Sequence, residues 1–120
     1  MSNPHVLVVD DEADIRALIK DILSDENFGV TVAANAEEAK ARISSDSFDV
    51  GIFDVNMPGQ NGIDLTRDVK GMPGGKEMKI IILTTESGDD LKKAGREAGA
   101  VGWLTKPFEE NDLLELIKRL

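Results

Sequence analysis

Short apolar runs alternate with segments of helical period along the whole chain. The runs are almost continuously apolar, as is typical of parallel strands that are covered on both faces. They predict five strands, at His5–Val9, Val30–Ala33, Phe48–Phe53, Lys79–Leu83 and Ala100–Leu104. Because right-handed crossovers place helices on both sides of such a sheet, we expect a doubly wound α/β fold.

The segments between these runs carry the three- and four-residue apolar spacing of amphipathic helices. The first shows this spacing from Ile15 to Leu23 and ends at Asn27 and Gly29, and the second begins at Asn35 with a capping-box-like Glu38. A third helix is expected at Ile63–Val69. A fourth is expected at Asp89–Ala98; it has only a thin apolar stripe and is capped by Gly99. The last helix begins near Glu109 and is predicted to bury Leu113, Leu116, Ile117 and Leu120.

The chain of 120 residues fits a single (βα)5 domain spanning residues 1–120, without a linker or an internal repeat. Periodicity does not give the order of the strands in the sheet. The flavodoxin-like order 2-1-3-4-5 is a candidate, and it places the ends of the first and third strands side by side.

Composition excludes several classes of function. The net charge of −9 disfavours nucleic acid and anionic membrane surfaces as partners. Cysteine is absent, so there is no disulfide framework and no thiol nucleophile, and the single histidine, His5, opens a predicted strand. The N-terminal Met1-Ser2-Asn3-Pro4 lacks the features of a signal peptide, and no apolar run is long enough to span a membrane. We expect a soluble cytoplasmic protein.

Acidic, hydroxyl and basic residues follow four of the predicted strands. Asp10 and Asp11 follow the first strand, Asp54 the third, Thr84 the fourth and Lys106 the fifth. The carboxyl ends of parallel strands lie at one edge of the sheet, so we expect these side chains to converge there. Clustered carboxylates repel each other unless a cation lies among them, and Mg²⁺ prefers this set of ligands. Asp54 is a competent nucleophile for a phosphoryl group.

Four motifs are distributed along the whole chain: Val8-Val9-Asp10-Asp11-Glu12, Asp54-Val55-Asn56-Met57-Pro58-Gly59, Leu83-Thr84-Thr85-Glu86 and Gly102-Trp103-Leu104-Thr105-Lys106-Pro107-Phe108. As a set, in this order, they make the chain similar to response-regulator receiver domains. Within this family the chain resembles the stand-alone chemotaxis receivers of the CheY type. That narrower resemblance rests on Thr84-Thr85-Glu86, on Gly99-Ala100-Val101-Gly102-Trp103, and on the absence of an output domain.

The resemblance implies a role for each of the site residues. Asp54 would accept a phosphoryl group from a phosphohistidine, and Thr84 and Lys106 would contact that group. Asp11 and Asp54 would bind Mg²⁺ directly, Asp10 through water, and Asn56 through its backbone carbonyl. Pro107 would follow a cis peptide bond. Asn56 and Glu86 would flank the phosphoryl position, and Thr84 and Trp103 would form the switch, although the family usually has Tyr or Phe at the position of Trp103.

The implied function is a phosphorylation-switched signalling protein that catalyses only its own phosphoryl transfer and dephosphorylation. A histidine kinase of the CheA type would phosphorylate it, a flagellar motor-switch protein would be its target, and a phosphatase is a possible further partner. The protein is expected to be a monomer.

Two other classes of protein fit these residues less well. A haloacid-dehalogenase-like phosphatase requires a second aspartate where this chain has Asn56, and a flavodoxin-like FMN carrier requires a phosphate loop that Asp10-Asp11-Glu12 would oppose. The chain could also be the excised receiver of a longer regulator.

Overall fold

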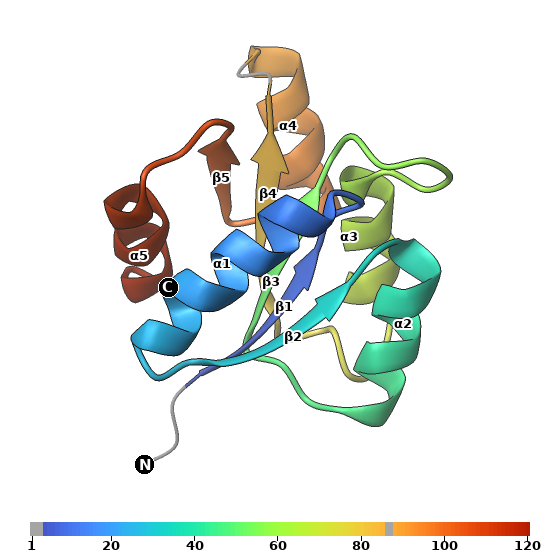
Figure 1. Ribbon diagram of the computed structural model, residues 1–120. Helices are drawn as coiled ribbons and strands as arrows, with labels where there is room; N and C mark the ends of the chain where they lie inside the picture. The colour runs from blue at the N-terminus through green and yellow to red at the C-terminus, as the bar shows by residue number, and fades with distance from the viewer. Residues whose placement is uncertain (1–3, 86–87) are drawn as a thin grey trace.

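A computed structural model describes residues 4–85 and 88–120. The expectations for the N-terminal Met1-Ser2-Asn3 and for Glu86 concern residues outside these ranges. Five parallel strands form one sheet in the order β2-β1-β3-β4-β5, which confirms the predicted doubly wound, flavodoxin-like fold. All the strand arrows point towards the same edge of the sheet (Figure 1).

Strands and helices alternate throughout the described chain. The strands are β1 (His5–Val9), β2 (Gly29–Ala33), β3 (Val50–Asp54), β4 (Lys79–Thr84) and β5 (Gly102–Thr105). The helices are α1 (Ala13–Asp25), α2 (Ala36–Ser45), α3 (Gly62–Lys70), α4 (Asp89–Ala98) and α5 (Glu110–Lys118). No helix in the described ranges is long and apolar enough to cross a membrane.

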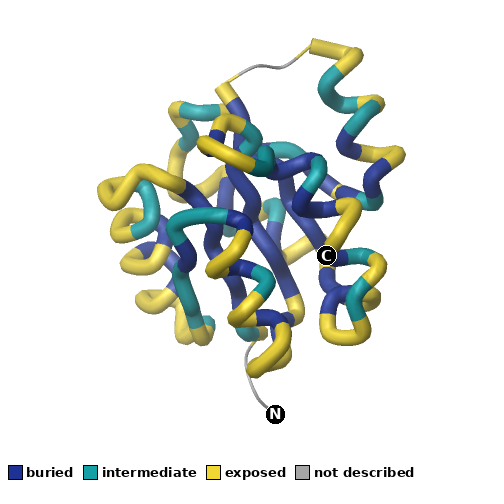
Figure 2. The backbone as a smooth tube through the Cα atoms, turned by 90° about the vertical axis from the view of Figure 1, so that its right-hand side faces the viewer, coloured by how far each residue is buried: buried dark blue, intermediate teal, exposed yellow. Residues whose placement is uncertain are grey.

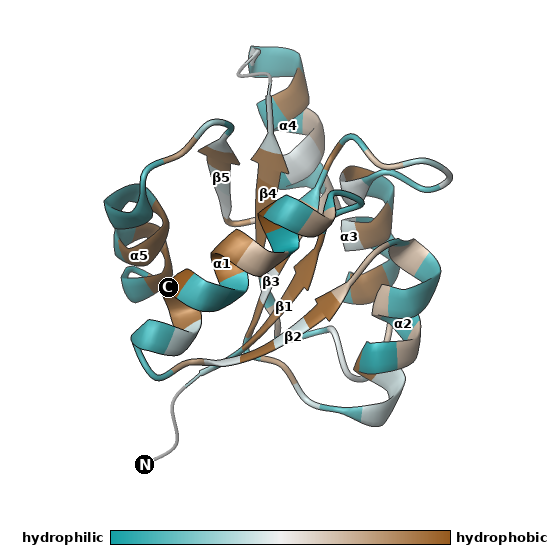
Figure 3. Cartoon of the chain, viewed as in Figure 1, coloured by the Kyte–Doolittle hydropathy of each residue, from teal (hydrophilic) through white to brown (hydrophobic). Residues whose placement is uncertain are grey.

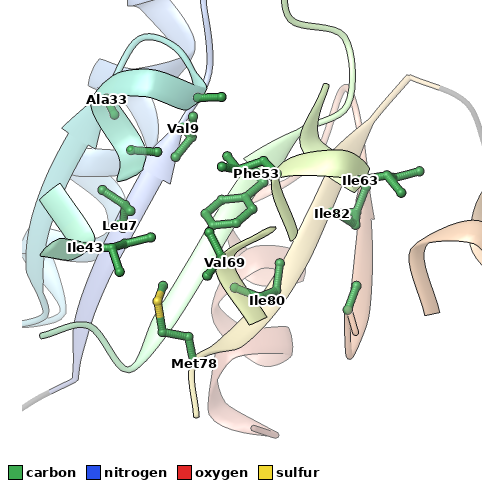
Figure 4. Close-up of a cluster of buried hydrophobic side chains, with 14 of the residues drawn as sticks. Leu7, Val9, Ala33, Ile43, Phe53, Ile63, Val69, Met78, Ile80 and Ile82 are labelled. Atoms are coloured by element: carbon green, nitrogen blue, oxygen red, sulfur yellow. The ribbon is translucent and has the colours of Figure 1, made fainter. Parts of the chain in front are cut away.

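The sheet separates two apolar cores. Helices α2, α3 and α4 cover one face, where Phe53 lies among Leu7 of β1, Ile80 of β4 and Val69 of α3 (Figure 4). Helices α1 and α5 cover the other face and pack their buried residues against the remaining side chains of the strands. Burying each large apolar side chain contributes about 1.5–3 kcal/mol. The inner strands β1, β3 and β4 are buried along almost their whole length, whereas the edge strands β2 and β5 are only partly buried. The helices alternate between buried and exposed positions (Figures 2 and 3).

Local signals in the sequence explain several element boundaries. Asn27 adopts a left-handed conformation, with φ of 67°, after α1. At α2, the Asn35 Oδ1 atom accepts a hydrogen bond from the Glu38 N–H. The Glu38 carboxylate accepts one in return from the Ala34 N–H, one residue before the helix cap. The first contact satisfies a backbone donor that the first turn of a helix leaves unpaired, and the second ties the preceding residue to the start of the helix.

Some predicted boundaries are wrong. Strand β3 begins at Val50, and Phe48 instead lies in the preceding loop, where its ring packs 4.5 Å from that of His5. Gly29 opens β2 instead of ending a helix, and β5 spans Gly102–Thr105. Leu120, which was predicted to be buried, is 40% exposed because α5 ends at Lys118.

Candidate functional site

The predicted site residues converge at the edge of the sheet where the strands end. Asp10 follows β1, Asp54 and Thr84 are the last residues of β3 and β4, and Lys106 follows β5. The Lys106 ammonium lies 2.9 Å from an Asp10 carboxylate oxygen and 3.5 Å from Asp54 Oδ2. The strand order brings these groups together, because β1 and β4 are the two neighbours of β3.

Asp10 is fully buried and is fixed by the turn that leads into α1. Its Oδ1 atom accepts a hydrogen bond of 2.8 Å from the Glu12 N–H. Its backbone carbonyl accepts one of 2.7 Å from the Arg16 guanidinium. The exposed Asp11 and Glu12 follow, and the structure brings carboxylate oxygens of Asp10, Asp11 and Glu12 within 4.8 Å of one another.

Asp54 presents two carboxylate oxygens in different environments. Its Oδ1 atom accepts a hydrogen bond of 3.1 Å from the Asn56 N–H. Its Oδ2 atom is buried and receives no hydrogen bond within the described part of the chain, where the Lys106 ammonium at 3.5 Å is its ion-pair partner. One oxygen therefore anchors the side chain, and the other retains lone pairs that can attack an electrophile.

Burial and charge control the ionisation of Asp54 and Lys106. The pKa of Asp54 is raised from 3.8 to about 6, chiefly by burial and also by the charge of Asp10, against the opposing effects of the Asn56 N–H and Lys106. Burial alone would lower the pKa of Lys106, but the hydrogen bond and charge of Asp10, with the charges of Asp54 and Glu12, raise it overall. Lys106 therefore remains a cation facing two carboxylates.

Thr84, Asn56 and Trp103 lie around this acidic pair. Thr84 is buried, and its backbone carbonyl accepts a hydrogen bond of 2.7 Å from the Lys106 N–H, which joins the ends of β4 and β5. The Asn56 amide lies 3.3 Å from the Thr85 hydroxyl. Trp103 lies on β5, beside Ile82 of β4. The Lys106–Pro107 bond is cis, as the resemblance predicted.

Three groups that shape the site do not follow from the sequence patterns. Glu12 belongs to the Val8-Val9-Asp10-Asp11-Glu12 motif, but its spacing alone does not place it in the carboxylate cluster. Arg16 carried no signal, since a basic residue on a helix is usually solvated. Gly62 opens α3 so close to β3 that a Cβ atom there would lie 2.3 Å from the Asp54 carbonyl oxygen.

The carboxylates fit a hard divalent cation. Three acidic side chains gather beside a buried fourth, Asp54, and their mutual repulsion is relieved only in part by Lys106. Carboxylate oxygens are the ligands that Mg²⁺ prefers.

Substitution of Asp54 by asparagine is expected to stabilise the metal-free fold at neutral pH. The pKa of Asp54 is higher in the folded protein than in the unfolded chain, so its ionised form opposes folding. The cost is absent below pH 3.8, grows between pH 3.8 and about 6, and is complete above that window. A shift of this size corresponds to a gain on the order of 3 kcal/mol for Asp54→Asn at pH 7.5.

Urea unfolding in EDTA at pH 4 and pH 7.5 measures this gain. The gain should be much smaller at pH 4, where Asp54 is protonated in the folded protein and only partly ionised in the unfolded chain. Equal stability of the two proteins at pH 7.5 would show that the folded site tolerates the charge of Asp54 without cost.

Comparison with known proteins identifies the family. The sequence model of one protein family, the response regulator receiver domain, matches residues 6–118 of this chain. The chain belongs to the response regulator receiver family. The chemotaxis protein CheY4 of Vibrio cholerae is 38% identical, and its structure superposes with a TM-score of 0.95 over 98% of both chains.

Curated relatives of the receiver include longer proteins. The protein PetR of Rhodobacter capsulatus is 40% identical over 94% of this chain, and the transcriptional regulatory protein ResD of Bacillus subtilis is 35% identical over 96% of it. The receiver chain spans about half the length of these two relatives, 46% and 47% respectively. Receiver domains act as signalling switches and generally bind Mg²⁺ at an acidic pocket, and this chain carries a group of three acidic side chains at Asp10, Asp11 and Glu12.

Proposed function

We propose that this receiver is switched by phosphorylation of Asp54 in a Mg²⁺-dependent reaction. The observation that carries the proposal is the buried Oδ2 atom of Asp54, which receives no hydrogen bond within the described ranges and faces the Lys106 ammonium at 3.5 Å. Such an oxygen is free to attack phosphorus, and the reaction forms the Asp54 O–P bond while the bond from phosphorus to the leaving group breaks.

The residues around Asp54 have separate tasks in this reaction. The Asn56 N–H holds the Oδ1 atom, so the carboxylate presents Oδ2 to the phosphoryl group. Lys106 supplies positive charge beside that oxygen and is itself held by Asp10. The hydroxyl of Thr84 can donate to a phosphoryl oxygen from the end of β4. Electrostatic stabilisation of this kind is the main contribution that proteins make to phosphoryl transfer.

We propose Asp10, Asp11, Asp54 and the Asn56 backbone carbonyl as the groups that hold Mg²⁺, with Glu12 beside them. The ion, when bound, neutralises charge on the phosphoryl oxygens. This assignment is supported by the gathered carboxylates and by the exposure of Asp11, whose side chain is accessible to an entering ion.

Substitution of Asp11 by alanine is expected to abolish Mg²⁺ binding without weakening the metal-free fold. Asp11 is exposed, and removing it relieves repulsion from Asp10 and Glu12 worth on the order of 1 kcal/mol. Calorimetric titration with Mg²⁺ and urea unfolding in EDTA measure the two effects. Asp14→Ala, which removes an exposed acid of α1 outside the cluster, is the control. A clear loss of metal-free stability would mean that Asp11 is a structural residue.

We infer that phosphorylation changes partner binding through Thr84 and Trp103. A phosphoryl group on Asp54 draws the Thr84 hydroxyl towards it, and the ring of Trp103 moves and reshapes the surface formed by α4, β5 and α5. The switch requires only a difference in stability between two existing conformations. We propose that the protein is a monomer that binds its partners through this surface. The only reactions that it catalyses would be the transfer and the loss of its own phosphoryl group.

Trp103, the single tryptophan, reports this change. Beryllofluoride, which mimics a phosphoryl group, should change its emission in the presence of Mg²⁺ beyond the effect of Mg²⁺ alone. In Thr84→Ala that additional change should be suppressed, because the hydroxyl that follows the mimic is gone, while phosphorylation by acetyl phosphate continues. An identical emission change in both proteins would exclude Thr84 from the switch.

We propose a cytoplasmic chemotaxis role, with residues 1–120 acting as one receiver unit. A CheA-like histidine kinase would be the phosphoryl donor, a flagellar motor-switch protein the target, and a phosphatase a further partner. The similarity to Vibrio cholerae CheY4 over 98% of both chains supports this role. The similarity to PetR and ResD supports the alternative of a receiver within a longer regulator. Faster phosphotransfer from a chemotaxis kinase than from kinases of transcriptional regulators would favour the first role.

A further inference from the structure

The indole ring of Trp103 packs against α4 at Gly95. A Cβ atom built on Gly95 would lie 3.2 Å from Cζ2 and Nε1 of the ring and 3.4 Å from Cε2. Contacts this short require the ring to move by a few tenths of an ångström. Gly95 is buried inside the helix, and the next residue, Arg96, places its guanidinium carbon 5.7 Å from the centroid of the ring.

Glycine is an unfavourable residue in the interior of a helix, because it restricts the unfolded chain least. In α4, Gly95 has an ordinary helical conformation, so no turn or positive φ requires it. The indole that occupies the missing side-chain space gives a local reason for this glycine. Trp103 in turn packs against the apolar core on the α2, α3 and α4 face of the sheet.

The ring is held in this position without a hydrogen bond. Its Nε1 atom is buried and has no acceptor among the described residues. A buried tryptophan N–H usually donates a hydrogen bond. When it has no acceptor, the conformation in which the N–H is buried is less stable. Movement of the ring away from Gly95 therefore breaks no hydrogen bond and allows the N–H to gain one.

We propose that Gly95 is a positioning residue: the space beside its missing side chain, which we call the seat, holds the Trp103 ring against α4. This contact couples the position of the ring to that helix. Trp103 lies beside Ile82, two residues before Thr84 on β4, so the seat is close to the phosphorylation site. The seat itself follows from the packing, whereas its part in signalling rests on the proposed function.

Fluorescence of Trp103 tests the seat without any phosphoryl group. Gly95→Ala adds the Cβ atom that displaces the ring, so acrylamide quenching should increase and the emission should shift to longer wavelength. Glu97→Ala, an exposed substitution on the same helix, should leave both unchanged. Unchanged quenching in Gly95→Ala, or an equal increase in Glu97→Ala, would overturn the proposal.

A double-mutant cycle separates the seat from a general effect on the helix. Phenylalanine at position 103 is smaller than the indole and leaves room for the added methyl group. In Trp103→Phe, the Gly95→Ala substitution should raise the urea midpoint, measured by circular dichroism, more than it does in the wild type. Equal midpoint shifts in the two backgrounds would mean that Gly95 and the ring act independently, which would also overturn the proposal.

Beryllofluoride with Mg²⁺ then tests the link to signalling. The emission change should be smaller in Gly95→Ala than in wild type, because the added methyl group has already displaced the ring from its wild-type position. An equal change in both proteins would contradict coupling through Gly95. A wild type without any response would overturn the proposed function, while the quenching and urea results would still establish the seat.

Discussion

Asparagine at position 54 is expected to reduce phosphorylation by acetyl phosphate to background. The amide keeps the shape of the side chain, and its oxygen can still accept the hydrogen bond from the Asn56 N–H. It cannot act as the nucleophile, because its nitrogen lone pair is delocalised and its oxygen carries no full charge. Acetyl phosphate needs no kinase, so the result reports on the site alone. Intact-mass spectrometry in Mg²⁺ buffer measures the phosphorylated fraction.

Asp68→Asn is the matched control for this experiment. Asp68 lies on α3 and pairs with Lys40 and Gln60, away from the acidic pocket. The Asp68→Asn variant should be phosphorylated at the same rate as the wild type. Phosphorylation of Asp54→Asn at the wild-type rate would show that another residue is the acceptor.

Alanine at position 62 is expected to destabilise the fold by about 3 kcal/mol, at the upper end of the cost of overpacking. The added Cβ atom would lie 2.3 Å from the Asp54 carbonyl oxygen and 3.2 Å from that of Phe53. These are backbone atoms of β3, so relief requires α3 to move away from the sheet. Urea unfolding measures the loss. Phosphorylation should slow as well, since the same movement displaces the segment between Asp54 and α3.

Gly71→Ala provides a control for the effect of glycine itself. Gly71 ends α3 with φ of −88°, and a Cβ atom there would be 3.5 Å from its nearest neighbour, the Asp68 carbonyl oxygen. This substitution should change stability by less than about 1 kcal/mol. If Gly62→Ala were as stable as Gly71→Ala, the close approach of α3 to β3 would not be a constraint on the site.

Periodicity predicts the elements well because the apolar strands are buried on both faces. It fails at boundaries where an apolar residue is buried without belonging to the sheet. Phe48 is such a residue, since it precedes β3 and packs on His5. The ladder hydrogen bonds begin only with Asp49, whose N–H donates to the His5 carbonyl and whose carbonyl accepts from the Lys79 N–H.

The central residues of the candidate site can also be predicted from the sequence, because each lies at the end of a strand or directly after it: Asp10, Asp54, Thr84 and Lys106. Parallel pairing then brings them to one edge. The supporting contacts are not accessible in this way. The contact of Arg16 with the Asp10 carbonyl depends on how α1 docks on the sheet, and no spacing rule reports it.

The two glycines illustrate a second limit. From the sequence alone, Gly62 and Gly95 are simply unfavourable residues in a helix. The structure shows which group lies next to each glycine: the β3 backbone beside Gly62 and the Trp103 ring beside Gly95. A sequence shows that a side chain is missing, but the neighbour that occupies its space comes from a distant part of the chain.

The most direct test of the account is to map the phosphoryl group on the wild-type protein. The chain is incubated with acetyl phosphate in Mg²⁺ or in EDTA, reduced with borohydride to mark any acyl phosphate, digested, and sequenced by mass spectrometry. We expect one marked residue, Asp54, in the Mg²⁺ sample and none in the EDTA sample. A mark on another aspartate, or equal marking of Asp54 without Mg²⁺, would contradict it.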